Sequence, residues 1–595
     1  MKPASPIICI NDLLLWQADS EAQSNLVPLK TRSVLLNDKG VWLKPHNHSP
    51  KVIYCHDMAG NYLESDRHLG LTSVFPAFRF TRWHLIDVFV YFSHHSITVP
   101  PISWINLAHR QGVRVYGTLI FESKGNEFFS SVFVNAECSS LNVTTFAENL
   151  DRVRRESGFE GWLLNFEVEI SEAIMDGTWN SNGYELSNDI VHSRVAQFIK
   201  TLVSLGSEVV WYDAVTWSGQ LRYQNGLTEH NKPFLSLASQ GLFTTYCWTL
   251  DHLKRTQQLA DSASDSSRVF VGVDCFGRGC PGGGGWSTSE ALQLILDAMT
   301  ANPDRPLSVA LFAPGWPFEK CDLSRCQDNP VAAHNLIADD DEKFWTVLEK
   351  LIGRIRAVPY GCSEVHYPMV LSSHHGSEDA PAFLSTCCTG QGLIGIDRKP
   401  ASSMGLQQLI PSCRQLWDSP INPTVQSSST LDSPGRLFSS IQFVCDTPWG
   451  TGTCVRFRPS NDRRCEDTYL TELFTFGPGM VITCSKGSVR ISIGSVDGSG
   501  CASHRECQAF SLVLDYHRCR DIKYDVAPSR QYLNHDQVSA ESSGDYHWST
   551  LVYRLSSLSD QSSDIEIVRL GLLWRCALLP NGFLLGLVHI SNSLK

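Results

Sequence analysis

The 595-residue chain carries little charge for its size and has no dense stripe of basic residues. Charged residues make up 18% of the sequence, and the formal net charge is −12. Surfaces that bind nucleic acids need clustered Lys and Arg to neutralise phosphates, so this composition argues against a nucleic-acid partner. Hydrophobic residues account for 42%, as in an ordinary globular protein. The length allows several domains and a large core.

The sequence also shows neither the pattern of a secretory signal peptide at Met1–Gln17 nor an uninterrupted apolar stretch long enough to span a membrane. In Met1–Gln17 the apolar run is broken by Asn11 and Asp12, and no small-residue cleavage site follows. The most apolar late stretch, Leu570–Ile590, is interrupted by an arginine and a Pro-Asn pair. The 20 cysteines therefore indicate reduced thiols rather than a disulfide framework. We expect a cytosolic protein without a membrane partner.

No internal repeat of fixed period is present, but apolar runs typical of β-strands alternate with helical patterns. The eight strand candidates are Lys51–Asp57, Leu85–Phe92, Val113–Glu122, Gly161–Glu167, Glu208–Asp213, Gly241–Trp248, Val269–Phe276 and Leu307–Pro314. The helical patterns are Pro101–Gly112, Val143–Gly158, Asp189–Gly206, Leu250–Ala260, Ser287–Thr300 and, after the last strand, Asp339–Ile355. Alternating strands and helices imply a parallel sheet. Eight such units predict an α/β fold, a (β/α)₈ TIM barrel, which typically needs about 250 residues.

The texture of the sequence changes after about residue 360, where Ser, Gly, Thr and Pro become frequent and helical periodicity ends. Short strand-like runs follow, separated by turn clusters. They are Ser440–Cys445, Gly452–Phe457, Met480–Ile493, Phe510–Leu514 and Phe583–Ile590. We therefore expect a loosely structured lead-in over residues 1–45, a barrel over 46–360, and one or two β-sandwich-type modules over 365–595.

The strand candidate at Gly161–Glu167 ends in polar residues that share one face. Side chains alternate across a strand, so one face holds Gly161, Leu163, Asn165, Glu167 and Glu169, and the other holds Trp162, Leu164, Phe166 and Val168. In an α/β barrel, active-site groups stand at the C-terminal ends of the strands. An antiparallel edge strand with one wet face fits the spacing equally well.

The residues Phe159–Glu167, which read Phe-Glu-Gly-Trp-Leu-Leu-Asn-Phe-Glu, carry a more specific signal. This stretch resembles the catalytic strand of the endo-β-N-acetylglucosaminidases of glycoside hydrolase family 85, which is marked by Gly-Trp followed by Asn-x-Glu. Further segments resemble that family in the same order: Cys55–Met58, Tyr62–Glu64, Ile86–His95, Thr98–Pro101, Val210–Asp213, Gln224–Asn225, Gly272–Asp274, Phe276–Gly279 and Phe312–Trp316. The resemblance covers roughly residues 50–320.

The resemblance implies a retaining mechanism assisted by the substrate. Most glycosidases use two carboxylates, whereas this strand offers Asn165 where a second carboxylate would stand. An amide there can hold the 2-acetamido group of N-acetylglucosamine while its oxygen attacks the anomeric carbon. The family likeness implies that role for Asn165, general acid and base catalysis for Glu167, and a hydrogen bond from Tyr212 to the acetamido group. No metal or organic cofactor is expected.

Several further residues are candidates for binding sugars. Glu122 ends a strand and either lines the cleft or caps a loop. Trp248 ends a predicted strand and Trp316 follows one, and each serves either as a sugar platform or as a packing residue. Tyr223 stands where the family is expected to carry a tryptophan, which leaves the preference between hydrolysis and transfer open. Glu169, one step further along the strand face, is an alternative acid, but we expect it to lie past the strand end in solvent.

Three other patterns favour ordinary structural roles. Gly277–Gly282 spells G-x-G-x-x-G, but it follows a late strand and contains a proline, as an irregular loop does. His94 and His95 have no third metal ligand at a useful spacing, so we interpret them as a satisfied structural pair. The cysteine pairs Cys321 with Cys326 and Cys387 with Cys388 lack the C-x₂-C spacing of zinc modules.

We therefore expect a hydrolase that cuts the GlcNAc-β1,4-GlcNAc core of N-glycans on glycoproteins, glycopeptides or free oligosaccharides. A chitinase-like enzyme is an alternative, but such enzymes carry a D-x-x-D-x-D-x-E strand that is absent here. A non-catalytic glycan-binding protein on a barrel scaffold is the alternative from another class. The joint presence of Asn165, Glu167 and Tyr212 argues against it, because a lectin needs no such set.

Overall fold

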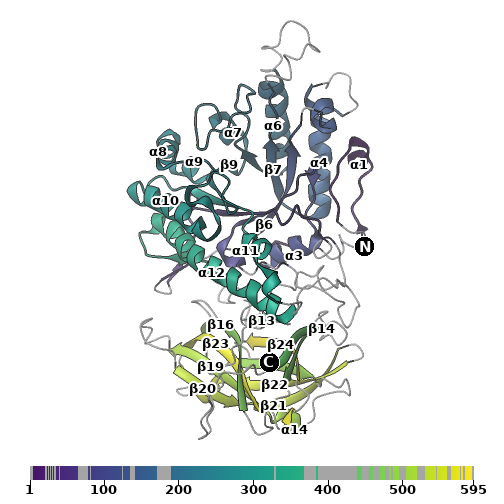
Figure 1. Ribbon diagram of the computed structural model, residues 1–595, viewed down its shortest axis with the longest axis vertical. Helices are drawn as coiled ribbons and strands as arrows, with labels where there is room; N and C mark the ends of the chain where they lie inside the picture. Colours follow the sequence, from purple (N-terminus) through teal and green to yellow (C-terminus); the bar gives the residue numbers. More distant parts are fainter. Residues whose placement is uncertain are drawn as a thin grey trace.

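The computed structural model describes most of residues 4–367 and separate segments of 383–591 (Figure 1). Gaps in the first part lie at 21–22, 24–25, 27, 30, 33–34, 39–40, 64–66, 68–77, 79, 81, 124, 135–140, 171–188 and 327–329. The later segments are 383–385, 438–444, 454–459, 468–475, 481–483, 487–494, 504–518, 529–543, 546–558, 564–575, 578–579 and 583–591. Glu64, Cys387 and Cys388, which the sequence singled out, lie outside the described residues.

Eight parallel strands form a closed barrel. They are β3 (Val52–His56), β4 (Val88–Tyr91), β6 (Arg114–Phe121), β7 (Gly161–Phe166), β8 (Glu208–Tyr212), β9 (Gly241–Phe243), β10 (Val269–Asp274) and β11 (Ser308–Phe312). Each strand pairs with the next one along the chain, and β11 returns to β3 in parallel register. Pairing of β4 with β6 completes the ring, and the short β5 (Ile97–Thr98) adds to β6 in antiparallel fashion. The predicted (β/α)₈ fold is confirmed.

Helices connect the strands and surround the barrel (Figure 1). They are α3 (Ile102–Arg110), α4 (Val143–Ser157), α6 (Ala196–Ser204), α7 (Lys232–Leu237), α8 (Leu250–Leu259), α9 (Ala263–Ser267), α10 (Thr288–Ala301), α11 (Trp316–Lys320) and α12 (Pro330–Ala357). Shorter or wider helical turns are η1 (Trp83–Leu85), η2 (Phe129–Val134), η4 (Asp189–Val195), η5 (Pro281–Gly283), η6 (Gly285–Ser287), η7 (Leu323–Cys326) and η8 (Val358–Tyr360).

The local sequence explains where α4 begins and ends. The side chain of Asn142 accepts a hydrogen bond from the Thr145 backbone N–H at 2.9 Å, which satisfies one of the free donors of the first turn. Gly158 ends the helix with a left-handed φ of 81°, and Arg154 and Arg155 occupy the last turn. This helix leads directly into β7, so its ends fix where the central strand starts.

The barrel strands separate two apolar layers. Inside the barrel, Leu163 packs with Ile53, Val90, Val210 and other inward residues. Outside it, Trp162 and its alternate neighbours along β7 pack in the layer that the helices cover. Because both faces of β7 are covered, only its C-terminal end is available to a ligand.

The N-terminal lead-in, expected from the sequence to be loosely structured, contains short regular elements among its described residues. It forms α1 (Ile10–Leu14), β1 (Leu35–Asn37) and β2 (Trp42–Leu43), and β1 pairs with β12 (Val365–His366), which follows the last barrel helix. Arg32 donates to the backbone carbonyls of Gln111, Ile86 and Trp83 at 2.6, 2.5 and 2.6 Å. These contacts join two sequence-distant segments, so local periodicity did not reveal them.

Two antiparallel sheets lie below the barrel in Figure 1, on the far side of α12. The first contains β13 (Phe383–Ser385), β14 (Phe438–Val444), β15 (Cys454–Pro459), β18 (Ser488–Gly494), β21 (Gln537–Ser543), β22 (Tyr546–Arg554) and β24 (Phe583–Ser591). The second contains β16 (Thr468–Thr475), β17 (Val481–Thr483), β19 (Phe510–Arg518), β20 (Ser529–Asn534) and β23 (Asp564–Arg575). Two short helices, α14 (His504–Cys507) and η12 (Leu555–Leu558), accompany them.

The two sheets pack against each other through aromatic rings. Phe583 of the first sheet lies 5.0 Å from Phe510 and 5.4 Å from Trp574 of the second, measured between ring centroids. The run Met480–Ile493 was predicted as one strand, which is wrong. It supplies β17 to one sheet and β18 to the other. No helix in the described part of the chain is long and apolar enough to cross a bilayer.

Candidate active site

The end of β7 places Asn165 and Glu167 side by side at the C-terminal mouth of the barrel. Asn165 pairs with Ile120 of β6 within the ladder. The Glu167 backbone N–H then donates to the Phe121 carbonyl at 2.8 Å, one step beyond the last strand residue. Both side chains therefore leave the same face of a strand that is held by hydrogen bonds up to Glu167.

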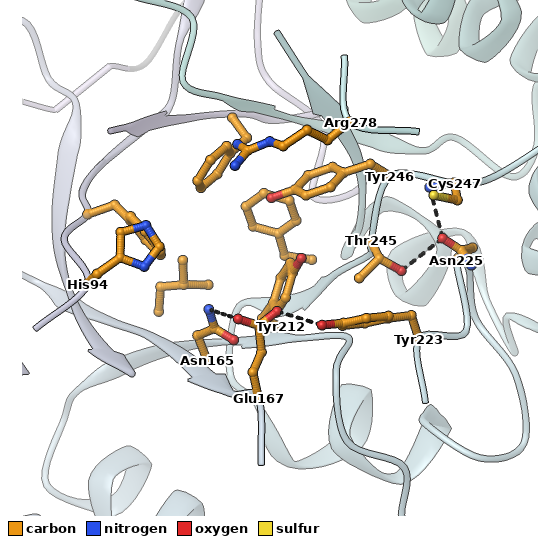
Figure 2. A pocket seen from close by; sticks show the side chains of 14 residues that line it. His94, Asn165, Glu167, Tyr212, Tyr223, Asn225, Thr245, Tyr246, Cys247 and Arg278 are labelled. Carbon is orange, nitrogen blue, oxygen red and sulfur yellow. Dashed lines mark hydrogen bonds between the residues drawn. The ribbon is translucent and has the colours of Figure 1, made fainter. Parts of the chain in front are cut away.

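A pocket of about 300 Å³ opens at this end of the barrel (Figure 2). Its lining includes four of the seven predicted site residues, Asn165, Glu167, Tyr212 and Tyr223. The other lining residues are Phe92, His94, Leu163, Asn225, Phe243, Thr245, Tyr246, Cys247, Arg278 and Phe312. The pocket thus combines an apolar floor with polar groups from several strand ends, as ligand sites in barrels do.

Asn165 has a buried oxygen that nothing in the described residues satisfies. Its side chain donates from Nδ2 to Glu167 Oε2 over a long 3.5 Å. Its Oδ1 has no hydrogen-bond partner among the described residues, although the residue is only 5% exposed. A buried acceptor without a partner costs about 1–3 kcal/mol. The pocket is therefore prepared for a ligand that brings an N–H or O–H donor to Asn165.

Burial raises the pKa of Glu167 above its ordinary value. The hydrogen bond from the Tyr223 hydroxyl to Oε1, at 3.0 Å, opposes this shift. Glu122 adds to the increase, whereas the Asn165 amide and His94 reduce it. A carboxyl group with a raised pKa is suited to donate a proton near neutral pH.

Tyr212 ends β8 and stands with its hydroxyl beside that of Tyr246. Burial raises the pKa of both tyrosines well above the ordinary value, so both remain neutral hydrogen-bond donors. Tyr246 was not predicted from the sequence as a site residue. Tyr246 lies within the predicted strand Gly241–Trp248 but beyond the observed end of β9 at Phe243, so strand alternation could not show which way its side chain points.

A buried carboxylate fixes the loop that follows β8. Asp213 Oδ2 accepts the backbone N–H groups of Gln224 and Asn225 at 3.1 and 2.9 Å, and Oδ1 accepts Asn231 Nδ2 at 2.8 Å. Burial raises the pKa of Asp213 to about 7, although these donors oppose the shift. Asn225 in turn accepts from the Thr245 hydroxyl at 3.0 Å. The loop between Asp213 and Asn225, which carries Tyr223, is therefore tied to two strand ends.

His94, which the sequence indicated as part of a satisfied structural pair with His95, lines the wall of the pocket (Figure 2). Its Nδ1 lies 2.9 Å from Glu122 Oε1, and this hydrogen bond raises the pKa of His94. Glu122 itself is exposed and stands at the rim, outside the pocket lining. Arg278, also missed in the sequence, lies across the pocket and donates to Asp274 at 2.7 Å.

The structure does not bring the two predicted tryptophan platforms into this pocket. Trp248 is 2% exposed, packs in the layer outside the barrel, and donates from Nε1 to the Gly272 carbonyl at 2.6 Å. Trp316 begins α11 and packs against Trp286, with ring centroids 5.1 Å apart, and against the same outer layer. Both residues therefore make the kind of contacts that the packing alternative predicts.

The remaining sequence patterns lie in ordinary structure. Gly277 has a φ of 79°, and an added Cβ would lie 1.9 Å from the Gly283 carbonyl oxygen. The tight loop between β10 and α10 therefore requires a glycine at position 277. Within the described residues, no group of three or more His, Cys, Asp or Glu side chains is arranged to hold a metal ion.

Comparison with known proteins agrees with this geometry. The family model described as glycosyl hydrolase family 85 matches residues 62–393, which is more than half of the chain. The chain belongs to glycosyl hydrolase family 85. The matched residues contain the whole candidate pocket and all but the first of the barrel strands.

Several family 85 relatives are recognisable over the same region. The chain is 35% identical to the cytosolic endo-β-N-acetylglucosaminidase of Gallus gallus over 342 residues, which cover 57% of this chain and 41% of the relative. The Homo sapiens protein of the same name is also 35% identical, over 58% of this chain and 40% of that one. Cytosolic endo-β-N-acetylglucosaminidase 2 of Arabidopsis thaliana is 33% identical, over 52% and 39%. The matches thus span about two fifths of these relatives.

A solved structure shares the fold of this family 85 chain. The glycoside hydrolase domain of Endo-D from Streptococcus pneumoniae R6 superimposes with a TM-score of 0.50 at 16% sequence identity. The superposition covers 100% of this chain and 84% of that domain. At this identity, the likeness supports the barrel and its following sheets but carries no residue roles.

Proposed function

We propose that this family 85 chain is an endo-β-N-acetylglucosaminidase that hydrolyses the GlcNAc-β1,4-GlcNAc core of N-glycans and leaves one GlcNAc on the protein or peptide. The observation that carries the proposal is the unsatisfied Asn165 Oδ1 beside Glu167. The N–H of a 2-acetamido group is the donor that this oxygen lacks. A sugar without that group would leave the oxygen unpaired, which costs binding energy.

In the first step, the acetamido oxygen of the bound sugar attacks its own anomeric carbon. The glycosidic C–O bond breaks, and the leaving oxygen takes the proton of Glu167, whose pKa is raised by burial. The product is a cyclic oxazolinium ion. Asn165 accepts the hydrogen bond of the acetamido N–H, which carries increasing positive charge, and the Tyr212 hydroxyl holds the same group from the next strand.

In the second step, Glu167 acts as a carboxylate base. It takes a proton from water while the water oxygen bonds to the anomeric carbon and the oxazolinium ring opens. Two successive displacements retain the anomeric configuration. A sugar hydroxyl in place of water gives transglycosylation instead. The side chains required for these steps are Glu167, Asn165 and Tyr212, all of which line the pocket.

The proposed setting is the cytosol, since the Gallus gallus, Homo sapiens and Arabidopsis thaliana relatives are all named as cytosolic enzymes. The proposed substrates are N-glycans on glycoproteins or glycopeptides, and free oligosaccharides. The proposed catalytic unit is the barrel over residues 46–360 together with β1 of the lead-in and β12, its partner strand after the barrel.

Mass analysis of a high-mannose glycopeptide after incubation with the protein tests the proposal. Turnover should leave a peptide bearing one GlcNAc and release an oligosaccharide that ends in the other. Glu167→Gln is the matched control and should leave the glycopeptide intact. A non-catalytic glycan-binding protein would retain the glycopeptide without cleaving it, and that result would reject the enzymatic proposal.

A further inference from the structure

We propose that Tyr223 is a positioning residue that determines which oxygen of Glu167 carries the catalytic proton. This inference rests on the proposed function, in which Glu167 is the general acid. The sequence presented Tyr223 only as a ring that replaces an expected tryptophan. The structure gives its hydroxyl a separate contact that a phenyl ring could not make.

The two oxygens of Glu167 have different surroundings (Figure 2). Oε1 accepts the Tyr223 hydroxyl at 3.0 Å, whereas the hydrogen bond that the described residues give to Oε2 is the long one from the Asn165 amide, at 3.5 Å. Burial, with the charge of Glu167, raises the pKa of Tyr223, so its hydroxyl remains a donor throughout the neutral range. Oε1 is therefore committed as an acceptor. The proton of the acid form resides on Oε2, beside the residue that holds the acetamido group.

The backbone on both sides of Tyr223 is held in place by carboxylates. Before it, the Leu221 N–H donates to Glu169 Oε2 at 2.8 Å. After it, the N–H groups of Gln224 and Asn225 donate to Asp213, as described above. Although Tyr223 is 47% exposed, its phenol therefore reaches Glu167 from a fixed backbone. Such preorganisation is expected of a group that orients a catalytic carboxyl.

The groups around Glu167 determine how its pKa changes when the Tyr223 hydrogen bond is lost. Tyr223 and Tyr212 approach from β8 and its loop, Asn165 from β7, Glu122 from the end of β6 and His94 from the end of β4. Of the interactions that favour the ionised carboxylate, the Tyr223 hydrogen bond is the largest. Removal of the hydroxyl should therefore raise the pKa of Glu167 and allow the proton to occupy either oxygen.

The first test is the pH profile of kcat/KM for glycopeptide hydrolysis by Tyr223→Phe. The basic limb reports deprotonation of the acid in the free enzyme. We expect it to move upward by about 0.5–1 pH unit, because a partly exposed hydrogen bond to a charge is worth about that much. At the wild-type optimum, kcat should fall about tenfold while KM stays within about twofold.

Tyr246→Phe is the matched control, since it removes another phenol hydroxyl of the same pocket that makes no hydrogen bond to Glu167. It should leave the basic limb unchanged. If Tyr223→Phe also leaves the limb and kcat unchanged, the ring of Tyr223 acts by packing alone and the positioning role is wrong. Circular dichroism of both variants shows that the comparison concerns folded protein.

A titration without turnover separates this inference from the proposed function. In protein labelled with ¹³C at the glutamate carboxyl carbon, the NMR resonance of Glu167 is assigned as the one that is missing from the spectrum of Glu167→Gln. Its chemical shift is then followed as a function of pH. The pH at the midpoint of this titration should be about 0.5–1 unit higher in Tyr223→Phe than in the wild type. If the wild type is inactive but the pKa of Glu167 shifts in Tyr223→Phe, the proposed glycosidase activity is wrong and the contact of Tyr223 with Glu167 still stands. An active wild type without the shift would reject the role of Tyr223 alone.

Discussion

Glu169 Oε2 accepts the backbone N–H of Leu221 at 2.8 Å, although Glu169 lies on the same face of the chain as Glu167, two residues further on. This contact gives the second carboxylate of the central stretch a structural task. It holds the start of the segment that carries Tyr223, whereas Glu167 stands in the pocket with Asn165. The two glutamates therefore differ in what surrounds them and not in their position in the strand pattern.

The first prediction separates these two carboxylates. Glu167→Gln should lower the rate of N-glycan hydrolysis roughly 10²–10⁴-fold, because the general acid is lost. Glu169→Gln keeps an oxygen acceptor for Leu221 and should lower the rate less than about threefold. Initial rates on one glycopeptide measure both. If Glu167→Gln keeps near-normal turnover and Glu169→Gln loses it, Glu169 is the general acid and the assignment of Glu167 is wrong.

The second prediction concerns Asn165. If its amide oxygen stabilises the forming oxazolinium ion, Asn165→Ala should slow the cleavage of native glycans roughly 10²–10³-fold. A preformed sugar oxazoline already contains the product of that step, so transfer from it should fall less than about tenfold. Rates measured on the two donors side by side check this. Equal losses on both donors would assign Asn165 a general structural role.

The third prediction concerns His56, which is 1% exposed. The centroid of its ring lies 5.0 Å from that of Trp104 and 5.3 Å from those of Phe78 and Phe89. Burial lowers the pKa of His56 to about 3, so the folded protein keeps it neutral. In the unfolded chain it gains a proton below about pH 6.5. His56 therefore stabilises the fold fully above that pH, and this contribution is lost as the pH falls toward 3.

Between pH 7 and pH 5 the loss should amount to about 2 kcal/mol. His56→Phe removes the titration, so its melting temperature should fall less over this interval than that of the wild type. The difference between the two pH values is the quantity to compare, because the substitution also alters packing at both. Equal declines in the two proteins, measured by scanning calorimetry, would show that His56 does not titrate on unfolding.

The fourth prediction concerns the attachment of the lead-in to the barrel. Arg32 donates to three backbone carbonyls and stacks over the ring of Tyr367, with its guanidinium carbon 4.5 Å from the ring centroid. Arg32→Ala should destabilise the protein by about 2–4 kcal/mol, since three acceptors lose a charged donor. Lys44→Ala, at an exposed site on the same segment, should change stability by less than about 0.5 kcal/mol. Similar melting temperatures for both variants would contradict this.

The apolar periodicity of the sequence was sufficient to predict the barrel. Each predicted strand overlaps an observed one, because buried parallel strands and amphipathic helices leave strong local patterns. The same periodicity assigned Leu163 to the interior and Trp162 to the outer layer. It failed for Met480–Ile493, whose apolar character is shared by two strands of different sheets.

Part of the site could be predicted for the same reason. Asn165 and Tyr212 belong to strands, and Glu167 follows its strand directly, so their direction is set by alternation from neighbouring residues. Trp248 was misplaced because β9 ends at Phe243. Beyond that point the chain turns, and the tryptophan enters the outer layer instead of the pocket.

By itself, the sequence determined the order of strands and helices, the family likeness and the residues at the end of the central strand. Only the tertiary structure decided which loop residues reach that strand. Tyr223 lies 56 positions from Glu167, and Arg32 lies 79 from Gln111. Contacts of this kind depend on barrel closure and on buried carboxylates such as Asp213 that fix the loops. Strand periodicity extends over a few residues and carries no information about such distances.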